Sequence, residues 1–264
     1  MQFDTRTDAH VLKIFREGFF MFSYYGSKSK LVNYYPKPTK DLIIEPFAGS
    51  ARYALKYCDR DVLLVDKYDT IVNIWKYVQN ASRNDILKMH LLVPKEKQSL
   101  DEFNFDCIEQ KQLLGFMIKA GSSRPALTPS KMRLKDDYIN TQIKQVAEIT
   151  SRIKHWKIIC GSYDEIENHD ATWFIDPPYQ FGGEHYKESS LNINFSNLKE
   201  WILNRNGEII VCENTKADWM EFKPLKKIQG ASNTNTTEAV FLKGWEEKRK
   251  EKDFTQNSLF GDGM

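Results

Sequence analysis

Residues 41–79 read DLIIEPFAGSARYALKYCDRDVLLVDKYDTIVNIWKYVQ, and this stretch decides the fold. Two short apolar runs, 42–44 and 61–65, have the length and composition of buried strands. Each is followed by a segment with helical spacing, 50–57 and 70–79, and Ser50 is a candidate cap for the first helix. Strand, helix, strand and helix in succession are typical of a parallel sheet covered by helices. We therefore expect an α/β fold.

The same signals return only in the second half of the chain. Further strands are predicted at 157–160, 172–175 and 208–212, a helix at 196–203, and an antiparallel pair at 225–228 and 238–242. Between the two blocks, helices are predicted at 106–118 and 137–154, with a break at 121–125. We expect one α/β domain from residues 20–80 and 155–243, a mostly helical insertion at 81–154, and a charged, mobile tail at 244–264.

Composition narrows the class of protein. The 264 residues are 41% hydrophobic and 28% charged, as in a globular protein with a core. No apolar run is long enough to cross a bilayer and the N-terminus lacks an apolar signal region, so we expect a cytoplasmic protein without membrane contact. The histidines and cysteines lack metal-ligand spacing, so no metal site is expected. Cys160 and Cys212 are predicted to be buried free thiols.

The segment Asp176-Pro177-Pro178-Tyr179 carries the strongest chemical signal. It follows the apolar run 173–175, and ligands of open parallel sheets bind at the carboxyl ends of strands. An exocyclic amine on an aromatic ring is a poor nucleophile, because its lone pair is delocalised. A carboxylate and a carbonyl held rigid by proline can accept its two N–H groups, and Tyr179 offers a face for a stacked base. The pattern indicates chemistry on such an amine.

Three weaker segments precede it. Glu45, Pro46, Phe47 and Gly49 form a strand-to-helix turn that allows close backbone approach to a ligand. Asp66 ends the second strand, where an acid often binds ribose hydroxyls, although a helix cap is the simpler interpretation. Tyr24 and Lys28 precede the first strand. Lys28 could bind a carboxylate and Tyr24 could stack, whereas each residue alone fits a solvated lysine and a core tyrosine.

In their order and spacing these segments resemble the Dam-like N6-adenine DNA methyltransferases of bacteria and phages. The resemblance covers roughly residues 22–80 and 155–242. It implies a Rossmann-like sheet that binds S-adenosyl-L-methionine, an inserted target-recognition region, and a catalytic tetrapeptide made by Asp176, Pro177, Pro178 and Tyr179. The cofactor-binding residues it implies are Tyr24, Lys28, Glu45, Pro46, Phe47, Gly49, Asp66, Ser162, Tyr163 and Asp176.

Two positions depart from the family pattern. Ala51 stands where the turn usually has a second glycine. Ser162 stands where relatives place an acid that binds the cofactor adenine, and Asp164 could take that role instead.

The predicted insertion carries a basic loop. Between Lys111 and Lys135 there are six basic residues and no acid. A solvated basic face is an equally good interpretation of that loop alone, but a base-modifying site elsewhere in the chain favours contact with double-stranded DNA. The residues predicted to bind DNA are Lys119, Ser122, Arg124, Lys131 and Arg133.

Alternatives stay open within and beyond this class. The tetrapeptide also suits methylation of adenine in RNA or of cytosine N4, whereas glutamine methyltransferases usually carry Asn at the position of Asp176. A non-catalytic DNA-binding relative is a different class. Gln256, Leu259 and Phe260 resemble a sliding-clamp docking peptide, although a plain disordered terminus is the favoured interpretation of residues 256–260. We expect a monomer or weak dimer.

Overall fold

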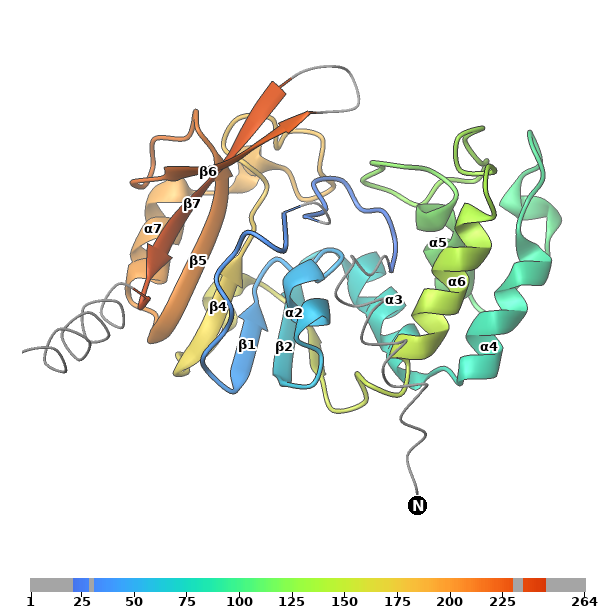
Figure 1. Ribbon diagram of the computed structural model, residues 1–264, viewed down its shortest axis with the longest axis horizontal. Helices are drawn as coiled ribbons and strands as arrows, with labels where there is room; N and C mark the ends of the chain where they lie inside the picture. The colour runs from blue at the N-terminus through green and yellow to red at the C-terminus, as the bar shows by residue number, and fades with distance from the viewer. Residues whose placement is uncertain (1–20, 29–30, 230–234, 246–264) are drawn as a thin grey trace, which may run out of the picture.

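The computed structural model describes residues 21–28, 31–229 and 235–245 (Figure 1). Within these ranges the chain forms a seven-stranded sheet in the order β3-β2-β1-β4-β5-β7-β6. The first five strands are parallel, and β7 runs antiparallel to both β5 and β6. The expected α/β fold and the antiparallel pair are confirmed. The strands are β1 (Leu42–Glu45), β2 (Asp61–Asp66), β3 (Lys157–Cys160), β4 (Ala171–Ile175), β5 (Gly207–Asn214), β6 (Lys223–Gln229) and β7 (Asn235–Lys243).

Successive apolar residues of the central strands serve the two faces of the sheet. Ile43 joins the hydrophobic cluster under α2 (Arg52–Lys56) and α3 (Asp69–Asn80), whereas Ile44 joins the cluster under α7 (Phe195–Leu203). Because both faces are covered, the strands are continuously apolar, and all five residues of β4 are buried. This arrangement leaves the carboxyl ends of β1, β2 and β4 as the place where polar side chains can gather.

The regular elements of segment 81–154 are helices, joined by loops. It contains α4 (Arg83–Lys88), α5 (Ile108–Met117) and α6 (Tyr138–Ile149), with short 3₁₀ helices η1 (Met89–Leu92) and η2 (Leu100–Glu102). These helices lie beside α3 at one end of the sheet (Figure 1). Phe116 of α5 and Ile143 of α6 belong to the same hydrophobic cluster as Trp75 of α3. The helices therefore extend the core of one sheet face. Target recognition by this segment stays a prediction.

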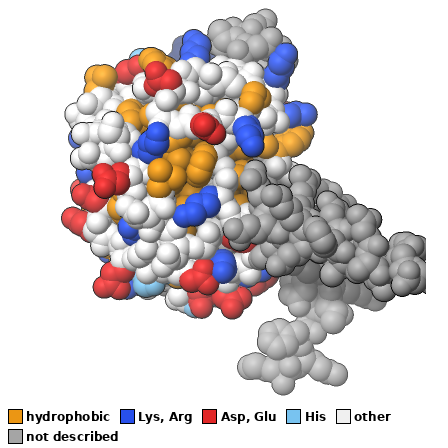
Figure 2. Space-filling model, turned by 90° about the vertical axis from the view of Figure 1, so that its left-hand side faces the viewer, with side chains coloured by type: hydrophobic (Ala, Val, Ile, Leu, Met, Phe, Trp, Pro, Cys, Tyr) orange, Lys and Arg blue, Asp and Glu red, His pale blue; other side chains and the backbone are white. Residues whose placement is uncertain are grey.

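The opposite end of the molecule carries α7 and strands β5–β7. Figure 2 views this end, where hydrophobic side chains gather and charged side chains of both signs surround them. Among the described residues, no helix is both long and apolar enough to cross a membrane.

One prediction about the cysteines is wrong. Cys212, on the inner strand β5, is buried, but Cys160 is exposed. Cys160 ends β3, an edge strand of the sheet, which pairs with β2 on one side only. Most of the predicted tail, including Gln256, Leu259 and Phe260, lies outside the described residues, as does the N-terminal segment 1–20.

Candidate active site

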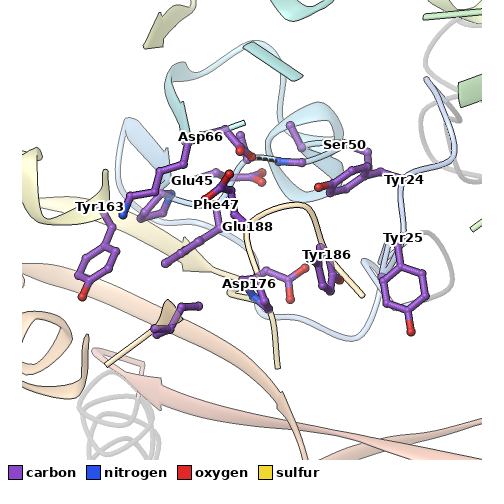
Figure 3. Close-up of a pocket in the computed structure, with 18 of the residues that line it drawn as sticks. Tyr24, Tyr25, Glu45, Phe47, Ser50, Asp66, Tyr163, Asp176, Tyr186 and Glu188 are labelled. Atoms are coloured by element: carbon purple, nitrogen blue, oxygen red, sulfur yellow. Dashed lines mark hydrogen bonds between the residues drawn. The ribbon is translucent and has the colours of Figure 1, made fainter. Parts of the chain in front are cut away.

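A pocket of about 1200 Å³, including its part open to solvent, lies at the carboxyl ends of the parallel strands. All ten residues predicted to bind a cofactor line it, as does Asp164. Figure 3 shows Tyr24, Tyr25 and Tyr186 on one side of the pocket and Tyr163 on the other. Of the predicted catalytic tetrapeptide, Asp176 and Pro178 belong to the lining, whereas Pro177 is buried and Tyr179 is half-buried beside it.

The turn after β1 forms one wall of the pocket. Gly49 and Ala51 both adopt left-handed backbone conformations, with φ of 46° and 44°. The Gly49 amide donates to the Asp66 carboxylate (2.9 Å), and the Trp75 indole donates to the Gly49 carbonyl (2.9 Å). These bonds hold the turn from the ends of β2 and α3. The prediction of Ser50 as the helix cap is wrong: α2 begins after Ala51, and the Ser50 hydroxyl donates to Ser27 instead.

Two acids contribute to the floor of the pocket. Glu45 is 2% exposed and accepts a hydrogen bond from the Ala54 amide of α2, and burial raises its pKa well above the usual value. Asp66 accepts from the Gly49 and Tyr68 amides, one on each oxygen. Burial raises the pKa of Asp66 to about 6, although these two hydrogen bonds lower it. Because a carboxylate has about four acceptor sites, Asp66 can accept further hydrogen bonds from a ligand.

Asp176 forms an ion pair that the sequence did not predict. The Lys28 ammonium lies 2.7 Å from the Asp176 carboxylate and 4.0 Å from that of Glu238. It also donates to the Gly26 carbonyl (3.1 Å) and lies 4.6 Å from the centre of the Tyr179 ring. Burial raises the pKa of Asp176 to about 6, although Lys28 opposes that rise. Burial lowers the pKa of Lys28, but Asp176 and Glu238 together outweigh it and raise the pKa above its usual value.

The ammonium therefore occupies the side of Asp176 that faces the Tyr179 ring. Any amine that binds to this oxygen and stacks on that ring must first displace Lys28. The sequence alone did not indicate that Lys28 and Tyr179 are in contact, because only the fold brings these two residues together.

A second carboxylate, Glu238 of β7, completes this group. It is 4% exposed and accepts hydrogen bonds from the hydroxyls of Tyr179 (2.7 Å) and Tyr35 (2.8 Å). No sequence pattern singled out Glu238 or Tyr35, because a glutamate in a strand pattern carries no signal until its neighbours are known.

Aromatic side chains form the walls. The rings of Phe47 and Tyr163 lie 5.5 Å apart, and those of Tyr24 and Tyr186 lie 5.9 Å apart. Tyr186 and Glu188 come from the segment that follows the tetrapeptide, and sequence reasoning missed both. That segment has few apolar residues and no regular spacing.

The charge of the lining is uneven. Among the described residues, five acids line the pocket (Glu45, Asp66, Asp164, Asp176 and Glu188) against three bases (Lys28, Arg52 and Lys67). Because Lys28 is already paired with Asp176, the pocket favours a ligand with positive charge and hydroxyl groups.

The predicted DNA-binding residues separate into two groups. Lys119, Arg124 and Lys131 are exposed, and Ser122 is half-buried. Lys131 pairs with Glu96 at 3.2 Å. The Ser122 carbonyl accepts from the Tyr25 amide (3.2 Å), which joins the basic loop directly to the pocket lining.

The predicted DNA contact of Arg133 needs a correction, because its side chain is buried. Arg133 is 8% exposed, donates to the Ser23 hydroxyl (3.0 Å), and its guanidinium lies 4.2 Å from the centre of the Tyr138 ring. It is a buried packing residue in this structure, although Lys131 and Met132 just before it are exposed.

No protein-family model matches the chain, and none of the curated proteins gives a match.

Proposed function

We propose that the protein is an S-adenosyl-L-methionine-dependent methyltransferase that modifies the N6 amino group of adenine in DNA. One observation carries the proposal. Asp176, the acid of the D-P-P-Y segment, lines the same pocket as Glu45 and Asp66, the acids that end the first two strands. This shared lining supports a proposed cofactor site beside a proposed acceptor for an aromatic amine.

The lining fits this cofactor. When bound, it would supply a methyl group on a positively charged sulfonium. Glu45 and Asp66 offer carboxylates to its ammonium and hydroxyl groups, and Phe47 and Tyr163 offer aromatic surface to its base. A ligand with several phosphates suits the lining poorly, because the acids there outnumber the bases.

Asp176 is proposed to orient the target amine. In its ionised form it accepts one N–H, and the Pro177 carbonyl accepts the other, which favours the rehybridised nitrogen that attacks a methyl carbon. Lys28 holds Asp176 ionised in the ligand-free protein and gives way to the amine. Positioning supplies most of the rate, since aligned reactants can gain about 7–11 kcal/mol over reactants free in solution.

The base must leave the duplex to reach this depth. Extrusion costs a few kcal/mol. Stacking on the Tyr179 ring returns about 1–3 kcal/mol once the Lys28 ammonium has moved from it. Lys119 and Arg124 are exposed cations that we expect to contact phosphates, and the Ser122–Tyr25 bond connects their loop to the pocket.

A single assay separates this proposal from its alternatives. The protein is incubated with methyl-labelled cofactor and, in parallel, with DNA, RNA or a glutamine-containing protein, and each product is digested to nucleosides or amino acids. Label in N6-methyldeoxyadenosine supports the proposal. Label in N4-methylcytosine, in RNA adenosine or in glutamine assigns another substrate, and no transfer to any of them indicates a non-catalytic binding protein.

A further inference from the structure

Glu238 is a buried carboxylate with three donors around one oxygen. Its Oε1 accepts from the hydroxyls of Tyr179 and Tyr35, and the Lys28 ammonium lies 4.0 Å from the same atom. A carboxylate this deeply buried is costly unless donors compensate for its lost hydration. Strand β7 places Glu238 opposite Asn214, at the carboxyl end of β5 and beside the pocket. Glu238 therefore lies where its contacts can affect the site.

The contacts of Glu238 determine where the Tyr179 ring lies. One end of the tyrosine is fixed by the hydroxyl bond to Glu238, and one face is covered by Lys28 at 4.6 Å from the ring centre. A tyrosine with its hydroxyl bound has little freedom to tilt. The plane offered to an aromatic ring is therefore set before any base arrives.

Lys28 lies between two carboxylates. It is in contact with Asp176 at 2.7 Å and within reach of Glu238 at 4.0 Å, and it also holds the Gly26 carbonyl. An amine that binds Asp176 would leave the buried ammonium without a carboxylate if Asp176 were its sole acid. Glu238 removes that cost, because a small movement of the lysine brings it to a second acceptor.

We propose that Glu238 is a positioning residue of this site: it fixes the Tyr179 ring through its hydroxyl, and it accepts the Lys28 ammonium when an amine replaces that ammonium at Asp176. This role rests on the proposed methyl transfer, and its experiment has one arm that needs no substrate.

The first arm compares single-turnover methyl transfer in the wild type, Glu238→Gln, Tyr179→Phe and the double variant. Glu238→Gln should slow transfer roughly 10–100-fold, because misplaced reacting groups cost that much. Its cofactor affinity should stay unchanged. The double variant should be little slower than Glu238→Gln, because the glutamine oxygen can accept only a weaker, uncharged hydrogen bond from the same hydroxyl. Losses that multiply in the double variant would overturn the proposal.

The matched control is Glu208→Gln. Glu208 is equally buried (2% exposed) and also accepts from a hydroxyl, that of Thr172, but it lies at the opposite end of β5. It should transfer at the wild-type rate. Equal losses in Glu208→Gln and Glu238→Gln would mean that removing any buried carboxylate slows the protein, and the specific role would be wrong. If Glu238→Gln does not fold, Tyr179→Phe decides: full activity in that variant overturns the role.

The second arm uses protein labelled with ¹³C at the tyrosine ζ-carbon, without ligand. The Tyr179 signal, identified by its loss in Tyr179→Phe, should move in Glu238→Gln and not in Glu208→Gln. An unmoved signal overturns the proposal whatever the activity. If the wild type transfers no methyl group, the proposed function is wrong, and so is the role of Glu238 in transfer. If the Tyr179 signal nevertheless moves in Glu238→Gln, the hydrogen bond between Tyr179 and Glu238 is still established.

Discussion

The Lys28 ammonium lies 2.7 Å from the Asp176 carboxylate, although the two residues lie far apart in the sequence. Lys28 precedes β1 and Asp176 follows β4, which pairs with β1. Both side chains are largely buried. A buried acid and base in contact compensate each other's lost hydration. Removing one partner is strongly destabilising, because it leaves the other charge buried and uncompensated. An incoming amine at Asp176 must therefore take over the role of the lysine.

The transfer rate should depend on pH through Asp176. Burial raises the pKa of this acid to about 6, Lys28 lowers it and Glu238 raises it. Below that value the acid is protonated and loses its attraction for an amine N–H, so the rate should fall as the pH falls below about 6. Lys28→Met should move the midpoint to higher pH and Glu238→Gln to lower pH. Profiles of kcat/KM against pH check this, because that ratio reports the pKa of the free protein, and midpoints that move in the opposite directions contradict it.

Cofactor binding should depend on Asp66. Its pKa is raised to about 6 by burial, so above that pH an ionised carboxylate is available to a cationic, hydroxyl-bearing ligand. Affinity should rise as the pH increases through this value. Asp66→Asn should weaken binding roughly tenfold, about 1.4 kcal/mol, and flatten its pH dependence. Isothermal titration calorimetry measures both, with Asp69→Asn, an exposed acid nearby, as the control. If Asp66→Asn and the control bind the cofactor with equal affinity, Asp66 does not contribute to cofactor binding.

Ala51→Gly should stabilise the protein. Ala51 has φ of 44°, a left-handed conformation that costs an alanine about 1–2 kcal/mol. Part of that gain is offset by the greater freedom of glycine in the unfolded chain, which leaves an expected increase of about 0.5–1 kcal/mol in the free energy of unfolding. Ala48→Gly in the same turn, without a positive φ, should destabilise by a similar amount. Denaturant unfolding compares them, and destabilisation by both substitutions would contradict the strain.

Arg124 and Arg133 should respond differently to substitution. Arg124 is exposed, so Arg124→Ala should weaken DNA binding and reduce the slope of log affinity against log salt by about 1. Arg133 is buried against Tyr138 and Ser23, so Arg133→Ala should leave that slope unchanged and lower the free energy of unfolding by about 1–3 kcal/mol. Fluorescence anisotropy at several salt concentrations tests this. An unchanged slope in Arg124→Ala would argue against the loop as a DNA contact.

Local pattern predicted the sheet well. The strand at 157–160 has the expected bounds, and the others differ by one to three residues at an end, because apolar runs bounded by Pro, Gly or Asp leave few alternatives. The same rule predicted that Glu45, Asp66 and Asp176 share a pocket, since acids that follow parallel strands meet at one edge. Ser162 and Tyr163, in contrast, were implied only by the family resemblance. Its prediction that Cys160 is buried is wrong because the order of strands, which makes β3 an edge, is a property of the whole fold.

The interior of the site could not be predicted in the same way. Glu238 and Tyr35 reach Tyr179 from a strand and a loop far away in sequence, and only tertiary packing decides which donors surround a buried acid. Likewise, a basic residue within a charged loop gives no sign of whether its side chain turns inward, as that of Arg133 does.

The central claim is that Asp176 orients an adenine amine beside a bound cofactor. Its most direct test measures cofactor affinity and single-turnover N6-adenine methylation in the same samples of wild type and Asp176→Asn, which keeps the side-chain shape and removes the charge. The account predicts transfer by the wild type and a loss of roughly 10²–10³-fold or more in the variant, with cofactor still bound. Equal transfer by both proteins would contradict it.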